Sequence, residues 1–468
     1  MNQENNKIEY FKGEFLHPSL DIKDNILILG FRFISKDLKE KEIFIVATRE
    51  RIRIYQDNHF DLKDKKYFIE AKTRLLARIE ERWDIEELIG FINDYNLGQD
   101  KTPTLKELFE KIKELSKKYV ELEREEDYIL ISSWIIGTYF FPAFSAYSFL
   151  HIKAPKNSGK TQCLNFLRQI CFNSVKAKPS LPALSDTVDS LRGTYLIDQA
   201  DLLKRQGNEE LVEILTDSYK KEGGKRRLRL PEKRGWKTVE QETYSPKAFA
   251  SVGELSEDLA DRCLIIPLIK SQKNFPEPSE ESEDWKKIRG ELYKVLLTNF
   301  SIIKNSYDVW KIGYKKNSKI IGRELELWLP LETILKLSGK EDELNQIRER
   351  FKQLYGYTEF EPSELEKATI KTIYQFFEEK RKNEIILTPS EIRERIDEEI
   401  WEDQFLKTRQ KDIKIGYIIK KFNLSTEKKR MNKGIAYLFQ KEKVKKIKDL
   451  YYKEPNNITH YSLLEKKQ

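Results

Sequence analysis

Apolar and polar residues follow two different periods along the chain, and the period changes with position. The runs 26–29, 43–47 and 52–55 are short and strand-like, whereas about 68–95 has helical spacing. The segment 104–123 has a strong amphipathic helical pattern. The pattern therefore predicts a small N-terminal α/β region, a turn or linker near residue 100, and then a long helix.

The stretch 128–150 contains 23 residues without a charge, which is long enough to span a bilayer. It also contains Gly137, Pro142 and four serines, and it ends just before a loop motif. We therefore expect a buried helix followed by a buried strand, with a membrane span as the alternative.

Strand-like and helical runs alternate from 150 to 270, which is typical of a parallel α/β sheet. An acidic loop with prolines at 274–284 precedes helical periodicity over 285–355, and 356–362 is a second break. The expected parts are residues 1–100, an N-terminal collar or oligomerisation region; 101–275, an ATPase core; 276–358, a helical lid and connector; and 359–468, a DNA-binding domain.

A candidate phosphate-binding loop follows the strand-like run that ends near residue 152. Its residues, with the one that follows, are Ala154, Pro155, Lys156, Asn157, Ser158, Gly159, Lys160, Thr161 and Gln162. In such a loop, backbone N–H groups bind phosphate oxygens, the lysine reaches the β- and γ-phosphates, and the hydroxyl of Thr161 ligates Mg²⁺. Ala154 stands where the usual motif begins with glycine. The loop predicts binding of ATP or GTP.

Asp198 follows the strand-like run 195–197 and is the candidate to hold Mg²⁺ through water, with a helix cap as the alternative. The next residue is Gln199, where a glutamate usually polarises the attacking water. A glutamine cannot accept a proton, so hydrolysis is expected to be slow. Two explanations are open: a Glu-to-Gln substitution that traps bound ATP, or another base, with Asp201 as the candidate.

The net charge of +8 is unevenly placed: residues 220–237 carry +7 and residues 405–450 carry +11, which leaves −10 for the rest. Two basic segments on an acidic body favour a polyanionic partner, although solvated lysine-rich faces give the same pattern. The first segment predicts a β-hairpin over 225–239 with its turn at 231–235.

The second basic segment belongs to a pattern of helices at 364–380, from 388, and at 412–422, followed by a hairpin over 424–439. This order predicts a winged helix, which binds DNA or, as the alternative, another protein. The predicted DNA contacts are Lys225, Arg226, Arg227, Arg229, Lys233, Arg234, Trp236, Lys420, Lys421, Lys428, Lys429, Arg430 and Lys433.

Cysteine and histidine usage limits the other site types. Three cysteines cannot form a disulfide scaffold, and none lies in a CxxC pair. Because the chain has only four histidines as well, its composition argues against a Cys/His zinc site. The first residues have no apolar stretch of the signal-peptide type. We expect a protein of the reducing cytoplasm.

Several motifs resemble those of superfamily-three helicases and of primase-helicases of plasmids, phages and genomic islands, which belong to the AAA+ class. The segments that carry the resemblance are 157–161, 196–201, 208–211, 245–248, 259–262 and 322–331. The resemblance implies an AAA+ P-loop ATPase with a parallel sheet and a helical lid. It also implies roles for Arg262 as an arginine finger given to a neighbouring subunit, for Arg323 as a lid arginine, and for Ser251 as a residue that orients water.

The sequence as a whole predicts an ATP- and Mg²⁺-dependent DNA helicase, working as a homo-hexameric ring in the replication of a mobile element, with no membrane partner. An ATP-switched origin-binding initiator or loader without unwinding activity is the first alternative. A regulatory ATPase that acts on a protein partner is the second.

Overall fold

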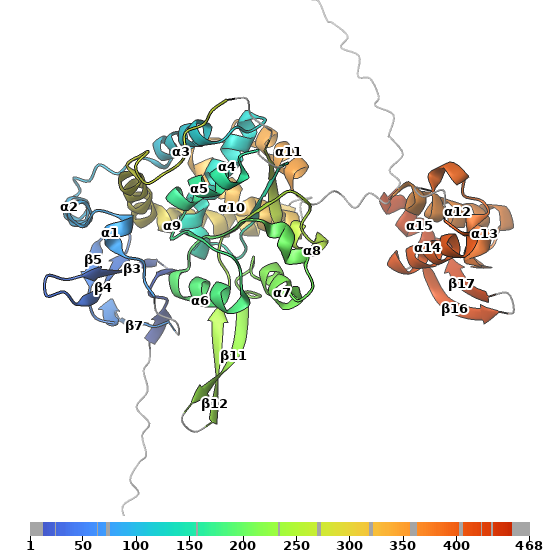
Figure 1. Ribbon diagram of the computed structural model, residues 1–468, viewed down its shortest axis with the longest axis horizontal. Coiled ribbons are helices and arrows are strands. Elements are labelled where there is room, and N and C mark those ends of the chain that lie inside the picture. The colour runs from blue at the N-terminus through green and yellow to red at the C-terminus, as the bar shows by residue number, and fades with distance from the viewer. Residues whose placement is uncertain are drawn as a thin grey trace, which may run out of the picture. The chain divides into compact units, whose positions relative to one another are not determined.

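The computed structural model describes residues 13–23, 25–62, 64–71, 75–155, 158–232, 235–268, 273–317, 322–355, 363–401, 406–422, 424–431 and 434–451 (Figure 1). The chain divides into two compact units, residues 1–357 and 358–468. Each unit has a hydrophobic core of its own.

A five-stranded sheet lies at the centre of the first unit, and every neighbouring pair of its strands is parallel. Its strands, in the order in which they pair, are β14 (Cys263–Pro267), β8 (Phe149–Lys153), β13 (Lys247–Ser251), β10 (Tyr195–Ile197) and β9 (Val175–Lys176). The predicted parallel α/β sheet over 150–270 is confirmed. Because the strands are parallel, their carboxyl ends meet at one edge of the sheet.

Helices connect these strands and cover the sheet. They are α3 (Leu105–Tyr119), α4 (Glu125–Phe140), α5 (Lys160–Ile170), α6 (Leu181–Leu191), α7 (Glu209–Asp217) and α8 (Glu257–Ala260), with short 3₁₀ turns η1 (Phe141–Ala143) and η2 (Ala200–Lys204). The amphipathic helix predicted from residue 104 begins at Leu105, where Thr104 forms a capping box, and ends at Tyr119, four residues earlier than its predicted end.

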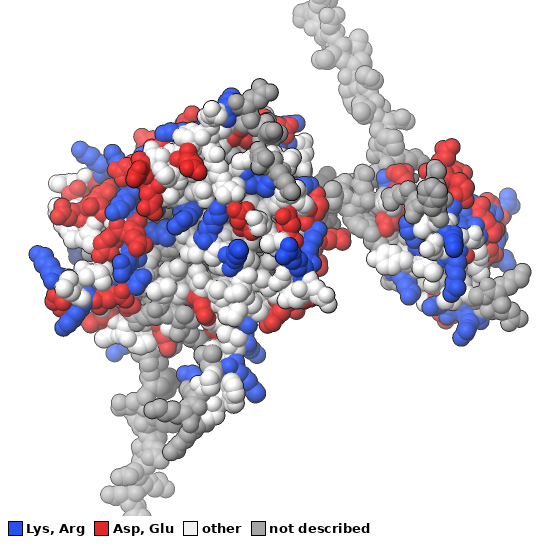
Figure 2. Space-filling model, viewed as in Figure 1, with Lys and Arg blue, Asp and Glu red and all other residues white. Residues whose placement is uncertain are grey.

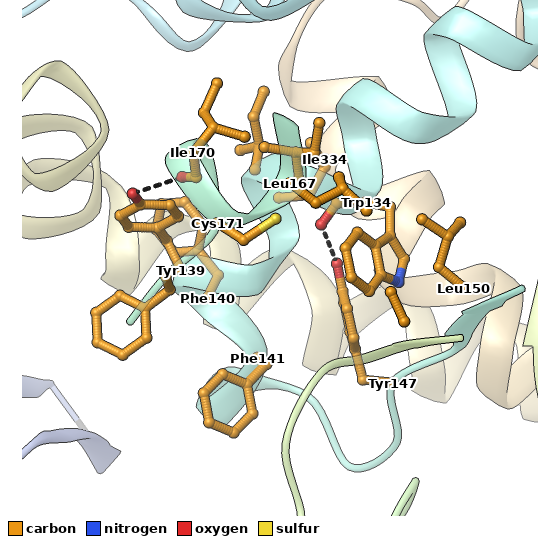
Figure 3. Close-up of a cluster of buried hydrophobic side chains, with 14 of the residues drawn as sticks. Trp134, Tyr139, Phe140, Phe141, Tyr147, Leu150, Leu167, Ile170, Cys171 and Ile334 are labelled. Carbon is orange, nitrogen blue, oxygen red and sulfur yellow. Dashed lines mark hydrogen bonds between the residues drawn. The ribbon is translucent and has the colours of Figure 1, made fainter. Parts of the chain in front are cut away.

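The uncharged stretch 128–150 forms most of α4, a 3₁₀ turn and the start of β8, as expected for a buried helix followed by a buried strand. Figure 3 shows α4 side chains packed with Tyr147, Leu167 and Ile170, where the Tyr139 hydroxyl donates to the carbonyl of Ile170. No helix in the described part of the chain is long and apolar enough to cross a bilayer.

The N-terminal region contains two small sheets and two helices. One sheet has the order β2 (Leu20–Lys23), β3 (Ile26–Ile34), β4 (Glu40–Ala47), β5 (Ile52–Tyr55); the other has the order β1 (Gly13–Leu16), β7 (Lys65–Ile69), β6 (His59–Leu62). The helices are α1 (Ile79–Arg82) and α2 (Ile85–Asn96). The predicted helical run from residue 68 is wrong at its start, because Phe68 pairs with Phe15 and His59 inside β7.

This region is attached to the central sheet by buried hydrogen bonds. Ser19 Oγ donates to the carbonyl of Leu191 (2.6 Å), and the Arg192 guanidinium donates to the carbonyl of Leu20 (2.9 Å). Both acceptors and donors lie at the end of α6 or beside β2, so the N-terminal sheets and α6 are held together.

The remaining elements of the first unit are a helical segment and a hairpin. The helices are α9 (Trp285–Asn317), α10 (Arg323–Leu337) and α11 (Leu344–Leu354). The hairpin consists of β11 (Lys225–Glu232) and β12 (Gly235–Glu242), and it projects from the body beside α6 (Figure 1). Its turn is tighter than predicted, since Pro231 pairs with Trp236 inside the ladder.

The described residues of the second unit form four helices, a 3₁₀ turn and a three-stranded antiparallel sheet of order β15-β17-β16. Its elements are α12 (Glu364–Lys380), β15 (Glu384–Leu387), α13 (Pro389–Arg393), η3 (Glu398–Ile400), α14 (Thr408–Lys421), β16 (Ser425–Met431), β17 (Gly434–Gln440) and α15 (Lys441–Tyr451). The structure agrees with the helix predicted at 364–380 and the hairpin predicted within 424–439. Helix α14 begins four residues before the expected 412.

Candidate functional site

Three loops leave the carboxyl-terminal edge of the central sheet side by side. The candidate phosphate loop, residues 154–161, follows β8; Asp198 follows β10; and Ser251 ends β13, which lies between those two strands. Crevices at this edge of an open parallel sheet are where such folds bind ligands. The sheet topology therefore brings the candidate phosphate loop, Asp198 and Ser251 to the same edge.

The described part of the candidate phosphate loop has a backbone that fits phosphate binding. Gly159 is the N-cap of α5 with a φ of 79°, in the left-handed region, and a Cβ there would meet no atom within 4 Å. The Ser158 hydroxyl is buried and has no hydrogen-bond partner among the described residues. Lys160 Nζ donates to the Ala154 carbonyl (2.8 Å) and to that of Pro155. The lysine thus lies over its own loop, where phosphate oxygens would replace two backbone acceptors.

Asp198 and Thr161 meet across the sheet edge. The Thr161 hydroxyl donates to Asp198 Oδ2 (3.2 Å), and the Gln199 N–H donates to Asp198 Oδ1 (2.9 Å). A hydroxyl and a carboxylate oxygen this close fit a Mg²⁺ ion, which takes one or two protein ligands and fills its remaining positions with phosphate and water oxygens. These two side chains would hold such an ion.

Gln199 is exposed and has a φ of 55°. This conformation is uncommon for a residue with a side chain. Asp201, the alternative base, is used within the fold: its Oδ1 accepts from the N–H groups of Val252 (2.8 Å) and Gly253 (3.0 Å). That carboxylate therefore fixes the loop after β13.

Two other predicted nucleotide contacts are committed to neighbours of their own chain. Ser251 is buried, and its hydroxyl donates to the carbonyl of Gly253 (2.6 Å) and lies 2.7 Å from His151 Nε2. Gln162 donates to the carbonyls of Tyr119 and Pro276, both at 3.0 Å. In this conformation, neither side chain is directed at the phosphate loop's ligand.

Lys176 is a site residue that the sequence did not predict. Its ammonium lies 3.4 Å from Asp198 Oδ2, the oxygen that also accepts from Thr161, and it donates to Asn165 Oδ1 (3.0 Å). Lys176 ends β9, a strand of two residues. A strand this short has no alternation to detect, so no sequence signal distinguished Lys176 from the other lysines.

A cavity of about 520 Å³ lies against Asp198 on the side of β9. The charged residues of its lining are Arg168, Lys176, Lys178 and Asp198. Three cations therefore surround the region beside the candidate metal acid.

The predicted arginine finger and lid arginine lie at the opposite edge of the sheet. The carbonyl of Arg262 accepts from Phe149 N–H (2.9 Å) at the start of β8, whereas the phosphate loop follows its end. Five residues of strand, or about 16 Å, separate the two. Arg323 pairs with Asp261 at the same edge. Neither arginine reaches the phosphate loop of its own chain.

Arg262 and Arg323 both lie over the ring of Tyr219, at 5.2 Å and 5.7 Å from its centroid. Arg262 is buried and donates to the carbonyl of Asp258, whereas Arg323 is half-buried. The sequence assigned the finger to Arg262, but burial leaves Arg323 as the more accessible cation of the pair.

Carboxylates of the second strand neutralise part of the basic hairpin. Glu240 lies opposite Arg227 in the ladder and pairs with Lys225 (2.8 Å) and with Arg227 (3.3 Å). Arg226 donates to Ser185 Oγ on α6 (3.1 Å). Arg229 is exposed, and Trp236 is 68% exposed. Figure 2 shows Lys and Arg side chains along this hairpin.

In the second unit, the described basic residues predicted to contact DNA are exposed. Lys420 lies on α14, and Lys428, Lys429 and Arg430 lie on β16. Helix α14 also exposes Ile413 and Tyr417, which the sequence analysis did not select. These two residues stand four apart and so share one face of the helix.

Six of the predicted contacts cannot be placed. Lys156, Asn157, Lys233, Arg234 and Lys433 lie outside the described residues, as does the side chain of Lys421.

No protein-family model matches the sequence, and no curated protein matches it. Solved structures match weakly. The SCCmec type IV Cch helicase has 9% identity and a TM-score of 0.36, over 90% of this chain and 94% of that one. The NrS-1 C-terminal region has 12% identity and a TM-score of 0.36, over 88% and 96%. A full-length MCM homolog from Methanopyrus kandleri has 10% identity and a TM-score of 0.32, over 70% and 77%. TM-scores this low leave the site to be argued from its own geometry.

Proposed function

We propose that this chain is an ATP- and Mg²⁺-dependent DNA helicase or translocase of the AAA+ class that works as a hexameric ring. The observation that carries the proposal is the meeting of the phosphate loop with Asp198 at one sheet edge, where Thr161 Oγ1 lies 3.2 Å from Asp198 Oδ2. The resemblance of the sequence motifs adds a role in the replication of a mobile element.

In this proposal, the chain's residues divide the work at the nucleotide. Lys160 leaves the carbonyls of its own loop and binds the β- and γ-phosphates, and the N-terminus of α5 adds N–H donors to them. Thr161 and Asp198 hold Mg²⁺, which neutralises charge on the phosphates. Gln199 orients water without accepting its proton, so turnover is slow.

The DNA contacts come from two places. In the chain, the hairpin lies between β10 and β13, the two strands that end beside the proposed nucleotide site. A change at that site can therefore reach the hairpin through either strand. Its exposed Arg229 and Trp236 offer a phosphate contact and a stacking surface. We propose that the second unit is a winged helix, with α14 in a major groove and β16 along the backbone.

The position of the arginines supports an assembly in which neighbouring subunits share the nucleotide, such as a ring. Arg323 and Arg262 lie at the sheet edge away from their own phosphate loop, so a nucleotide that they contact must be bound to another subunit. Such a cation stabilises charge on the transferred phosphoryl group.

Nucleotide binding by Lys160→Ala tests whether the candidate phosphate loop binds ATP. We expect the variant to lose binding of a fluorescent ATP analogue by a hundredfold or more, on the order of 3 kcal/mol for a desolvated charge-assisted contact. Lys153→Ala is the matched control, because Lys153 lies just before the loop and pairs with Glu254 instead. Equal affinity in the two variants would mean that the loop binds no nucleotide.

Gln199 supports a second candidate function, a nucleotide-switched initiator or loader that binds DNA without unwinding it. A site that binds ATP and hydrolyses it slowly suits a switch. Strand displacement from a forked duplex at low salt separates the two functions, because only the helicase releases the displaced strand.

A further inference from the structure

The Lys176 ammonium lies beside the carboxylate oxygen of Asp198 that would bind Mg²⁺, so the lysine and the ion would exclude each other there. Asp198 Oδ2 accepts from Thr161 and lies 3.4 Å from the Lys176 ammonium. Both partners are shielded, with 21% of the Lys176 side chain and 30% of the Asp198 side chain exposed. A second cation at this oxygen would repel the ammonium strongly.

Space for a displaced Lys176 side chain is present. The cavity of about 520 Å³ beside Asp198 is lined by Lys176 itself. The ammonium therefore has room to move away from the carboxylate.

The helix that follows Lys176 in the chain, α6, also contacts the hairpin. Helix α6 begins five residues after Lys176, and its Ser185 accepts from Arg226 of β11 (3.1 Å). Asp189 Oδ1 accepts from the N–H of Glu242 on β12 (2.8 Å). Both hairpin strands are thus fastened to α6 at their base.

We propose that Lys176 and Mg²⁺ compete for Asp198, and that their exchange is transmitted through β9 and α6 to the hairpin. Lys176 is a positioning residue: it holds the acid while no nucleotide is bound and releases it when Mg²⁺ arrives with nucleotide. This inference rests on the proposed nucleotide site. It adds a residue that sets the Mg²⁺ requirement and links it to the DNA-binding element.

The test measures binding of a fluorescent ATP analogue while Mg²⁺ is titrated. Lys176→Met removes the competing charge, so the half-saturating Mg²⁺ concentration should fall roughly three- to fivefold, the scale of one partly exposed ion pair. Lys176→Arg keeps the charge and should stay near the native value. Lys178→Met, which removes a neighbouring lysine of the same cavity, is the matched control and should also stay there.

The sign of the shift separates this role from a merely structural one. If Lys176 only orients Asp198, its loss raises the Mg²⁺ requirement, and that result, or no change, would overturn the inference while leaving nucleotide binding intact. If the native chain binds no nucleotide at any Mg²⁺ concentration, the proposed function itself fails.

A thiol-reactive dye on the hairpin tests the transmission. Thr238 is exposed on β12 and all three cysteines are buried, so Thr238→Cys gives one reactive position. Adding Mg²⁺ and nucleotide should change the dye signal in the native background. The same addition in the Lys176→Met background should give a signal change no more than half as large. Equal changes in both backgrounds, or none in the native one, would show that the exchange does not reach the hairpin.

Discussion

His151 illustrates how one buried side chain near the carboxyl-terminal edge of the central sheet affects the free energy of unfolding. It lies in β8, and its Nε2 is 2.7 Å from the Ser251 hydroxyl. Burial lowers the pKa of His151 from 6.5 to about 4. The folded chain therefore keeps this ring neutral at a pH at which the unfolded chain protonates it.

The consequence is a loss of stability in acid. Full stability is present above pH 6.5, and it falls as the pH drops toward 4, because only the unfolded state gains the proton. His151 alone should lower the free energy of unfolding by about 3 kcal/mol between pH 7 and pH 4. His17, whose pKa burial lowers to about 3, adds a loss of the same sign.

Urea denaturation from pH 4 to 7 measures this effect. His151→Gln keeps a hydrogen-bonding group beside Ser251 but has no titrating ring, so its stability should fall less steeply with pH than that of the native chain. Parallel slopes for the two proteins would show that His151 does not titrate between the folded and unfolded states.

Sequence motifs placed residues at the ends of strands where they supplied both residue type and spacing, and the roles of those residues stay predictions. Thr161 and Asp198 are 37 residues apart in sequence, yet the loop and the strand end predicted for them bring them into contact. Lys176 and Glu240 were missed, because each acquires its role from a partner on a different strand. No local pattern encodes such a pairing.

At the level of elements, the hairpin β11–β12 has the clearest prediction. Lys225 and Arg227 share the single carboxylate of Glu240, which offsets part of their charge. We therefore expect the indole of Trp236 and the charge of Arg229 to contribute more to DNA binding than those two cations.

Trp236→Ala should weaken binding of single-stranded DNA roughly tenfold, since stacking of a base on an aromatic ring contributes about 1–3 kcal/mol. Fluorescence anisotropy with a labelled oligonucleotide at fixed salt measures the loss. Leu97→Ala, which removes another exposed apolar side chain far from the hairpin in sequence, is the control. Unchanged affinity in Trp236→Ala would remove the hairpin from the DNA path.

Elements with strong local signals could be predicted closely. The capping box at Ser363 and Glu366 begins α12 at the predicted residue. By contrast, the predicted helix from residue 68 failed at its start, because pairing with the neighbouring strand β6 and with the distant strand β1 outweighs the local spacing of Phe68. Tertiary pairing of this kind is absent from a local window.

At the scale of the whole molecule, the separation of the arginines from the phosphate loop predicts activity only in an assembly. Arg323→Ala should reduce turnover roughly a thousandfold in the Gln199→Glu background, as expected for a finger-type arginine. It should leave nucleotide affinity within a few-fold, because Arg323 does not contact its own loop.

Mixing two inactive variants checks that the arginine acts between subunits. Lys160→Ala lacks a working phosphate loop and Arg323→Ala lacks the finger, so a mixed ring contains some interfaces with both groups intact. Turnover should reappear on mixing. If the mixture stays as inactive as its parts, the site is complete within one subunit or Arg323 has no part in it.

The central claim is that ATP hydrolysis is coupled to DNA, and ATP turnover with and without single-stranded DNA tests it most directly. The measurement compares the native chain with Gln199→Glu. This substitution adds a negative charge to a side chain of the same size, at a position whose backbone is left-handed. We predict that the glutamate variant turns over ATP faster than the native chain, and faster still with DNA. Silence of both proteins, with nucleotide and duplex DNA bound, would contradict the motor and leave a nucleotide-switched DNA-binding protein.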